Sequence, residues 1–255
     1  MKPLAIDLFC GLGGWTEGLL AEGYEVVGFD IERHDYGTGG YPAQLVLQDA
    51  LTLHGSQFKD AALIVASPPC QEYSYMAMPW SIAKEKKRKI LADPTEWLRL
   101  TTLFDACFRI QREACEAAGR HIPMVIENVR GANEWVGRSR WNFGSFHLWG
   151  DVPALMPIAS AIKNNGGSWF AIGSPGQKET GKNPVAELAG IKNKDQDGYE
   201  RSHPAAFGWK KPRTNSKSDA RARASAMIAK IPLPLSRHIA AYWKPAAIQR
   251  ERDET

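Results

Sequence analysis

The first 130 residues alternate short apolar segments with segments of helical spacing, and this alternation constrains the fold more than any other feature. The segments with the length and composition of buried strands are Leu4–Phe9, Glu25–Phe29, Ala61–Ala66 and Met124–Ile126. Strands that alternate with helices are typical of βαβ units, whose strands run parallel. We therefore predict an α/β fold with a doubly wound, mostly parallel sheet.

The best-defined helix is predicted between Asp93 and Gly119. Asp93 is a suitable N-cap, Pro94 suits the first turn, and Gly119 suits the C-terminal end. Apolar residues recur between them at helical spacing. Cys107 and Cys115 lie on this apolar stripe, so we assign them to packing, together with Cys10.

The composition changes after about Val152, and this change predicts the domain organisation. Residues 153–224 are rich in Gly, Pro, Asn, Ser and Lys and show no regular period. Helical character returns between Ala220 and Trp243. We expect residues 1–152 plus 225–255 to form the main domain and residues 153–224 to form a separate, irregular segment.

Composition excludes several classes of protein. With 44% hydrophobic and 24% charged residues among 255, the chain is expected to be globular. We find no apolar run long enough for a membrane span, and the N-terminus reaches Asp7 without the pattern of a signal peptide. The four cysteines lack zinc spacing, so we expect no metal site and a cytoplasmic location.

The net charge of +4 conceals two clusters of positive residues. Residues 84–89 contain five Lys or Arg and one Glu, and residues 201–225 contain seven Lys or Arg and one Asp. Such clusters are typical of surfaces that bind a polyanion, although each also fits an ordinary solvated surface.

A glycine-rich turn follows the first predicted strand, with the sequence Asp7-Leu8-Phe9-Cys10-Gly11-Leu12-Gly13-Gly14. Glycines at a strand end let the backbone turn tightly and approach a ligand. Asp30 ends the second strand, where a carboxylate can accept hydrogen bonds from ribose hydroxyls. The third glycine of the dinucleotide fingerprint is missing, which favours a nucleoside without phosphates or a purely structural turn.

Two further strand ends carry reactive side chains. In Ser67-Pro68-Pro69-Cys70-Gln71 the prolines fix the backbone around Cys70, which suits either a nucleophilic thiolate or a packed cysteine. Glu127-Asn128-Val129 follows another strand. The carboxyl ends of parallel strands meet at one edge of the sheet, where ligands bind in such folds.

These three motifs, in this order, resemble those of the DNA cytosine-5 methyltransferases. The family's D-L-F-x-G-x-G-G matches Asp7–Gly14, its P-C-Q loop matches Pro69–Gln71, and its E-N-V matches Glu127–Val129. The resemblance implies a Rossmann-like methyltransferase fold with S-adenosyl-L-methionine as cofactor. It is good over residues 4–75 and 122–130 and thin elsewhere, and it suggests a compact, phage-type member.

The resemblance also implies roles for individual residues. Asp30 would hold the ribose, Ile31 would pack on the adenine, Asp49 would lie near the adenine amino group, and residues 231–235 would return to the cofactor pocket. The remaining implied cofactor-binding residues are Asp7, Phe9, Gly11, Leu12, Gly13, Gly14 and Pro69.

For catalysis, the resemblance implies that the Cys70 thiolate adds to carbon 6 of cytosine. A protonated Glu127 would hydrogen-bond ring nitrogen 3. The family's Q-x-R-x-R element appears only as Val136–Arg140, with valine where glutamine is expected. Arg140 is the first candidate for the active-site arginine and Arg138 the second.

The implied partner is double-stranded DNA with a flipped-out base, bound by a monomer without metal. Residues 153–224 would then be the target-recognition segment, and the two basic clusters would contact DNA. The candidate base-reading residues of this segment are Asn164, Asn165, Arg201, Lys210, Lys211 and Arg213.

Two alternatives stay open. The same fold and thiol chemistry are used by relatives that methylate transfer RNA, and a catalytically silent DNA-binding protein could retain the fold. A nicotinamide-dependent dehydrogenase accounts for the glycine turn but not for the Pro69-Cys70-Gln71 loop.

Overall fold

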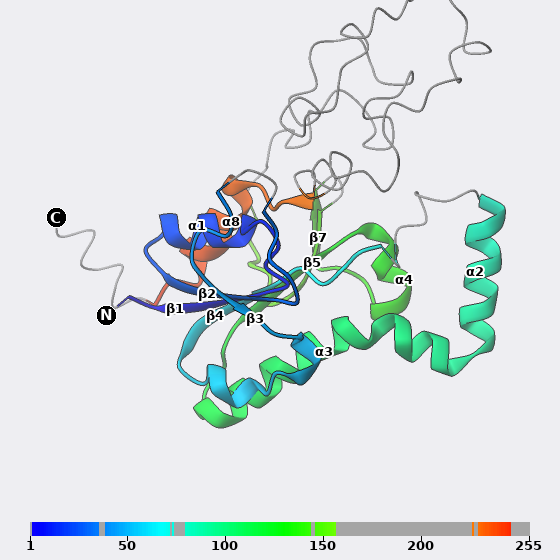
Figure 1. Ribbon diagram of the computed structural model, residues 1–255, viewed down its shortest axis with the longest axis horizontal. Coiled ribbons are helices and arrows are strands. Elements are labelled where there is room, and N and C mark those ends of the chain that lie inside the picture. The colour runs from blue at the N-terminus through cyan, green and yellow to red at the C-terminus, as the bar shows by residue number, and fades with distance from the viewer. Residues whose placement is uncertain are drawn as a thin grey trace, which may run out of the picture. The chain divides into compact units, whose positions relative to one another are not determined.

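The computed structural model describes residues 2–35, 39–71, 73, 80–143, 146–156, 226 and 229–245 (Figure 1). The chain divides into two compact units. The first comprises Met1–His34, Gly40–Ser160 and Ile231–Thr255, and the second comprises Asp35–Gly39 and Ala161–Lys230. Nearly all of the second unit lies outside the described residues. The predicted division at residues 153–224 stays a prediction.

The described residues form a seven-stranded sheet with the order β3-β2-β1-β4-β5-β7-β6. The pairs among β1 to β5 are parallel, and β7 runs antiparallel to both β5 and β6. The strands are β1 (Leu4–Leu8), β2 (Glu25–Asp30), β3 (Gln44–Leu47), β4 (Ala61–Ala66), β5 (Met124–Asn128), β6 (Trp141–Phe143) and β7 (Phe146–Gly150). The predicted doubly wound, mostly parallel fold is confirmed.

Helices cover both faces of this sheet. In Figure 1, α1 (Gly14–Ala21) and α8 (Leu233–Tyr242) lie side by side above it, and α3 (Pro94–Ala118) lies below. Close packing of α1 on α8 requires Gly18, because a Cβ there would collide with Ser236. The shorter elements are α4 (Asn133–Val136), η1 (Ala50–Thr52), η2 (Gly55–Phe58) and η4 (Arg130–Ala132).

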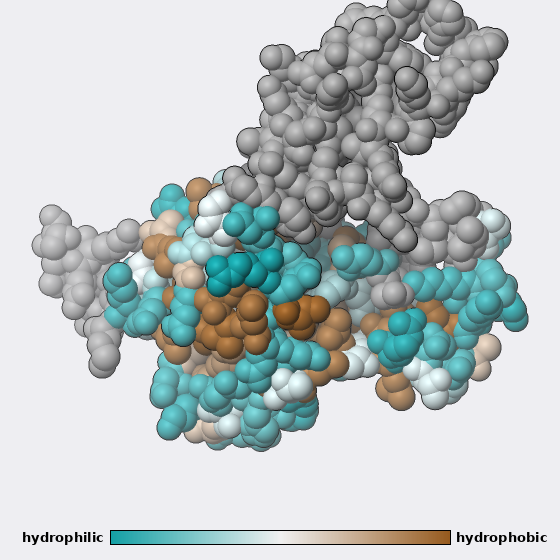
Figure 2. Space-filling model, viewed as in Figure 1, coloured by the Kyte–Doolittle hydropathy of each residue, from teal (hydrophilic) through white to brown (hydrophobic). Residues whose placement is uncertain are grey.

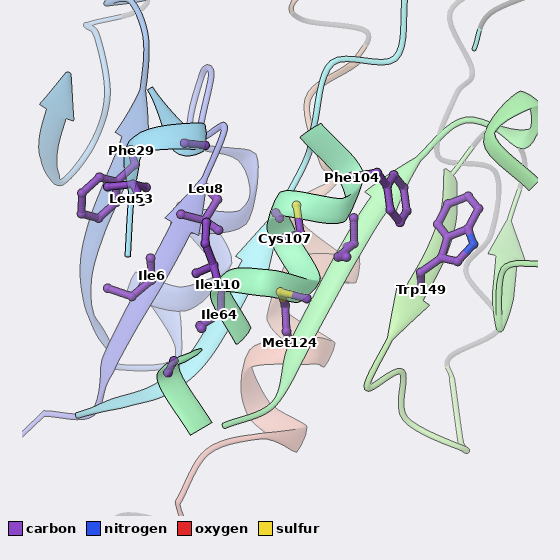
Figure 3. Close-up of a cluster of buried hydrophobic side chains, with 14 of the residues drawn as sticks. Ile6, Leu8, Phe29, Leu53, Ile64, Phe104, Cys107, Ile110, Met124 and Trp149 are labelled. Carbon is purple, nitrogen blue, oxygen red and sulfur yellow. The ribbon is translucent and has the colours of Figure 1, made fainter. Parts of the chain in front are cut away.

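The main core lies between the sheet and α3 (Figure 3). Alternate residues of the strands, such as Leu8, Ile64 and Met124, point toward this layer and are fully buried. Phe104 and Ile110 of α3 pack against them. Because side chains alternate along a strand, the intervening residues face the α1 side of the sheet.

The predicted helix after Asp93 is confirmed at both ends. The Asp93 carboxylate accepts a hydrogen bond of 2.9 Å from the Thr95 amide, and Gly119 ends the helix with φ of 63°. A further helix, α2 (Trp80–Ala92), precedes it. We did not predict α2, because a polar sequence without an apolar stripe gives little periodic signal.

Candidate active site

The turn after β1 has a backbone that few residues other than glycine adopt. Phe9, Gly11 and Gly13 have φ of 56°, 49° and 74°. This left-handed backbone at Phe9 explains why β1 ends at Leu8, one residue earlier than predicted. The Gly13 amide donates a 2.8 Å hydrogen bond to the Cys10 carbonyl. A Cβ at Gly13 would lie 2.6 Å from Cδ of Pro42, so this position also needs the small residue.

Asp30 holds this turn against the end of β2. Its Oδ2 accepts a 2.9 Å hydrogen bond from the Gly11 amide, and its Oδ1 accepts one of 2.8 Å from the Ile31 amide. The side chain is 11% exposed. The Glu32 amide, at 3.4 Å, and Nε2 of His34, at 3.5 Å, also contact Oδ1, so the acceptor capacity that Asp30 keeps for a ligand is on Oδ2. The structure thus brings together Asp30 and the glycine turn, as predicted from their strand ends.

The edge of the sheet beside this turn is open and partly apolar. A Cβ at Gly11 would meet no atom within 4 Å. Ile31 is 72% exposed, and Leu47 and Leu51 are also exposed. Asp49 caps η1 through a 2.9 Å hydrogen bond from the Leu51 amide. An open glycine backbone, a carboxylate with spare acceptor sites and exposed apolar side chains fit a nucleoside cofactor with an amino acid tail.

Asp7 differs from the other predicted cofactor residues because its carboxyl is fully buried. Its Oδ2 accepts a 2.7 Å hydrogen bond from the Thr16 hydroxyl, whereas its Oδ1 is buried with no hydrogen-bond partner. Burial raises the pKa of Asp7 to about 8. Burial also raises the pKa of the adjacent Cys10 thiol, which fits the packing role predicted for Cys10.

The loop that carries Cys70 begins at the end of β4, in the centre of the sheet. The Ser67 amide donates to the Leu8 carbonyl at 3.1 Å, and the Trp15 indole donates to the Ser67 hydroxyl at 3.0 Å. Pro68 is buried, Pro69 is exposed and Cys70 is half-buried. The β4 strand end is therefore tied to both β1 and α1, next to the glycine turn.

Asn128 joins the end of β5 to this loop. Its side-chain amide donates a 2.9 Å hydrogen bond to the Pro68 carbonyl. Glu127 precedes it and faces the α1 side of the sheet, because neighbouring strand residues alternate. The structure thus places the Cys70 loop and Glu127 on adjacent strands, β4 and β5, at one edge of the sheet.

The two predicted arginines lie further along the sheet. Glu127 pairs with Leu148 of β7, and the Leu148 carbonyl accepts a 2.8 Å hydrogen bond from the Arg140 amide. Two strand spacings thus separate the backbones of Glu127 and Arg140, about 10 Å. Arg138 is exposed in the connection between α4 and β6. Arg140 is exposed in the same connection, and its backbone hydrogen bond to Leu148 ties it to β7.

Sequence reasoning missed a polar cluster on the other face of this edge. His147 pairs with Asn128 in the sheet and lies 3.0 Å from the Ser139 hydroxyl through Nδ1. Burial, with a smaller effect of Arg130, lowers the pKa of His147. Asn133 accepts a 2.6 Å hydrogen bond from the Ser139 amide. The cluster fixes the segment that leads to Arg140, and no motif in the sequence signalled it.

The first basic cluster lies on α2, where hydrophilic residues predominate (Figure 2). Arg88 pairs with Glu85 on the same helix, and Lys87 forms an ion pair with Glu134 of α4. Lys84 and Lys89 are exposed. The second cluster and the predicted base-reading residues of 153–224 lie outside the described residues.

The described part of the chain has neither a candidate metal site nor a candidate membrane-spanning helix. No group of three or more His, Cys, Asp or Glu side chains there could hold a metal ion. None of its helices combines the length and the apolar character that a membrane crossing requires.

Comparison with solved structures gives partial matches. They include a DNA modification methyltransferase encoded within an E. coli prophage, with 22% identity, TM-score 0.35, and coverage of 51% of this chain and 33% of that one. The S. pombe Dnmt2 methyltransferase has 18% identity, TM-score 0.34, and coverage of 54% and 37%. The Entamoeba histolytica methyltransferase EhMeth has 18% identity, TM-score 0.35, and coverage of 54% and 41%. The aligned region therefore spans about a third to two fifths of these relatives.

Comparison at the sequence level identifies the family. None of the curated proteins matches the chain significantly. The sequence model of the C-5 cytosine-specific DNA methylases matches residues 4–131, half of the chain. This range contains the glycine turn, the Cys70 loop and the Glu127-Asn128-Val129 strand end. The chain therefore belongs to the C-5 cytosine-specific DNA methylase family.

Proposed function

We propose that this chain methylates carbon 5 of cytosine in DNA through a covalent adduct with Cys70. The observation that carries the proposal is the hydrogen bond from Asn128 to the Pro68 carbonyl. It couples the loop that presents the thiol to the strand end that presents Glu127. The glycine turn follows β1, which pairs with β4, and Asp30 ends β2, so the cofactor edge formed by the turn, Asp30 and Ile31 adjoins the Cys70 loop at the same edge of the sheet.

The family's methyl donor is S-adenosylmethionine, which when bound supplies an electrophilic methyl group for carbon 5. The glycine turn would hold its amino acid tail, Asp30 its ribose and Ile31 its adenine. Asp49, at the end of the β3 edge, would face the adenine amino group. These assignments are supported by the open backbone at Gly11, the acceptor capacity of Asp30 and the exposure of Ile31.

The chain's own residues would activate the cytosine. The Cys70 sulfur forms a bond to carbon 6, and the electron pair of the ring double bond moves toward carbon 5 and nitrogen 3. Glu127, in its protonated form, donates a hydrogen bond to nitrogen 3 and stabilises this charge. After carbon 5 is methylated, loss of its proton restores the double bond and releases Cys70 as the thiolate. Arg140 is proposed to bind the substrate near Glu127.

The ring atoms lie inside the stacked duplex, so the target base has to be flipped out. The exposed cations of α2, and those of residues 201–225, are proposed to contact phosphates. The described cations lie on α2, which the ion pair between Lys87 and Glu134 joins to α4, the helix that follows β5 in the chain.

The test is transfer of a labelled methyl group to duplex DNA and to transfer RNA in parallel, with Cys70→Ser as the control. Label in cytosine of DNA, absent with Cys70→Ser, is the expected result. Label in transfer RNA alone would show that the substrate is RNA and not DNA. No label in either nucleic acid would support the catalytically silent alternative.

A further inference from the structure

Tyr41 belongs to none of the motifs, but it makes the most specific contacts of the connection between β2 and β3. Its hydroxyl lies 2.5 Å from the Thr16 hydroxyl and 3.5 Å from Oδ2 of Asp7. Either hydroxyl can donate in the bond between Tyr41 and Thr16, and the Tyr41 hydroxyl also hydrogen-bonds the Cys10 side chain. The result is a hydrogen-bonded chain from Tyr41 through Thr16 to Asp7, which connects this loop to α1 and β1.

The ring of Tyr41 fits a space that only glycine leaves open. A Cβ at Gly28 on β2 would overlap the Tyr41 ring and hydroxyl. Gly28 is the register partner of Asp7 in the sheet, so the ring covers β2 where the buried carboxyl lies on β1. The next residue, Pro42, lies against Gly13, where a Cβ would come within 2.6 Å of the proline ring. The contacts of Tyr41 and Pro42 therefore restrict the position of the glycine turn.

The Asp7 end of this series of hydrogen bonds shows why the position of Tyr41 matters. Asp7 is fully buried, and Oδ1 has no hydrogen-bond partner. Its carboxyl is hydrogen-bonded by Thr16, through both hydroxyl and backbone amide, and by the Tyr41 hydroxyl. Thr16 is the third residue of α1, the helix that begins at Gly14 directly after Gly13. Moving Tyr41 would thus disturb both the carboxyl below the turn and the helix that follows it.

We propose that Tyr41 is a positioning residue that holds the glycine turn of residues 9–14 in the shape that binds the cofactor. Its hydroxyl holds the turn through the hydrogen bonds to Thr16 and Asp7, and its ring holds the turn by filling the space above Gly28. The proposal rests on the cofactor site of the proposed function, but the contacts that carry it belong to the free protein.

The first test compares Tyr41→Phe with Tyr24→Phe in the full chain. Tyr24 is buried, and its hydroxyl donates a 2.9 Å hydrogen bond to the Ala240 carbonyl, away from the turn. Binding of S-adenosylhomocysteine is measured by calorimetry. We expect Tyr41→Phe to weaken binding about tenfold, the effect of one lost hydrogen bond, and Tyr24→Phe to leave it within about twofold. Equal affinity of the two variants and the wild type would overturn the proposal.

A second readout does not require a ligand. The Cys10 amide donates to the Phe29 carbonyl, the Gly11 amide to the Asp30 carboxylate, and the Gly13 amide to the Cys10 carbonyl. Hydrogen exchange at these three amides therefore reports whether the turn keeps its shape. Exchange in residues 10–13 should be faster in Tyr41→Phe than in wild type and unchanged in Tyr24→Phe. If the wild type fails to bind the ligand, the proposed function fails, and this exchange still decides the role of Tyr41. Unchanged exchange would overturn it.

Gly28→Ala provides a second variant that leaves the tyrosine hydroxyl in place. The added methyl group should displace the Tyr41 ring and speed exchange in residues 10–13. In a Tyr41→Ala background the space is empty, so Gly28→Ala should have little further effect. An equal effect of Gly28→Ala in both backgrounds would show that it does not act through Tyr41 and would overturn the ring's role.

Discussion

The side-chain amide of Asn128 donates a 2.9 Å hydrogen bond to the carbonyl of Pro68, and both residues are buried. Since buried polar groups are costly to leave unsatisfied, this bond fixes the Cys70 loop relative to β5. Cys70 would act on carbon 6 and Glu127 on nitrogen 3 of one ring, so the separation of the two side chains has to be maintained. Asn128 serves that purpose from the opposite face of the sheet.

Asn128→Ala should therefore reduce both stability and methyl transfer. Loss of a buried hydrogen bond with an orphaned carbonyl costs about 1–3 kcal/mol of unfolding free energy. The transfer rate should fall further than cofactor affinity, because Asn128 lies on β5, which β4 separates from the glycine turn after β1. Urea unfolding, calorimetry and labelled methyl transfer would measure the three effects. Asn142→Ala, at an exposed position of β6, is the control and should change none of them. A uniform loss in all three would mean general destabilisation.

Asp30→Ala should weaken binding of S-adenosylmethionine or S-adenosylhomocysteine by about 1–3 kcal/mol, because charge-assisted hydrogen bonds are lost. The turn also loses the acceptor for the Gly11 amide. Glu32→Ala, two residues away and 68% exposed, is the matched control. Calorimetry should show no binding of NAD to the wild type. Heat from NAD without heat from S-adenosylmethionine would contradict the assignment of this edge.

Much of this site could be predicted because its signals are local. The strand ends, the glycine turn and the Asp93 cap each depend on a few neighbouring residues. Strand β3 was missed because its four residues are only half-buried or exposed and give no buried apolar run. The Tyr41 contacts were missed for a different reason. They depend on the register of Gly28 with Asp7, which exists only once the sheet has formed.

The buried carboxyl of Asp7 predicts a pH dependence of stability. Its pKa is raised from 3.8 to about 8, chiefly by burial, so the folded state keeps a proton that the unfolded chain releases. The stabilisation is complete below about pH 4 and is lost as the pH rises toward 8. Thr16, Tyr41, Cys10 and Asp30 are the polar groups that influence Asp7, and Asp30 opposes its ionisation.

The measurement compares wild type with Asp7→Asn, which has nearly the same shape and cannot ionise. Urea unfolding at pH 5, 7 and 9 gives the free energy of each protein. The stability of wild type relative to Asp7→Asn should decrease as the pH rises toward 8, because the unfolded wild-type chain releases an Asp7 proton that the folded protein keeps, whereas Asp7→Asn has no such proton. A difference that stays constant across the three pH values would contradict the raised pKa.

The cations of α2 predict a salt-dependent effect on DNA binding. Each Lys or Arg that contacts a phosphate contributes about one unit to the slope of log affinity against log salt. Replacing Lys84 and Lys89 by alanine should weaken DNA binding and reduce this slope by about two units if both contact phosphates. Arg112→Ala, exposed on α3, is the control. An unchanged slope would show that Lys84 and Lys89 do not contact phosphates of the DNA.

Cys70 carries the sharpest prediction, because the proposed role is covalent. DNA with 5-fluorocytosine at the target should trap the protein, since fluorine replaces the proton that must leave carbon 5. Methyl transfer then proceeds, but Cys70 cannot be eliminated. The adduct should require S-adenosylmethionine, survive a denaturing gel, and be absent with Cys70→Ser.

The other cysteines and Glu127 supply the controls for this trap. Cys10 and Cys107 are buried, and the Cys115 sulfur accepts a 3.2 Å hydrogen bond from the Ile122 amide, so serine at any of these three positions should still permit the adduct. Glu127→Gln should slow adduct formation by about 10²–10³-fold, the effect of losing one group that stabilises a developing anion. Methylation of DNA by Cys70→Ser at the wild-type rate would exclude the covalent mechanism, because no other cysteine lies on the loop that follows β4.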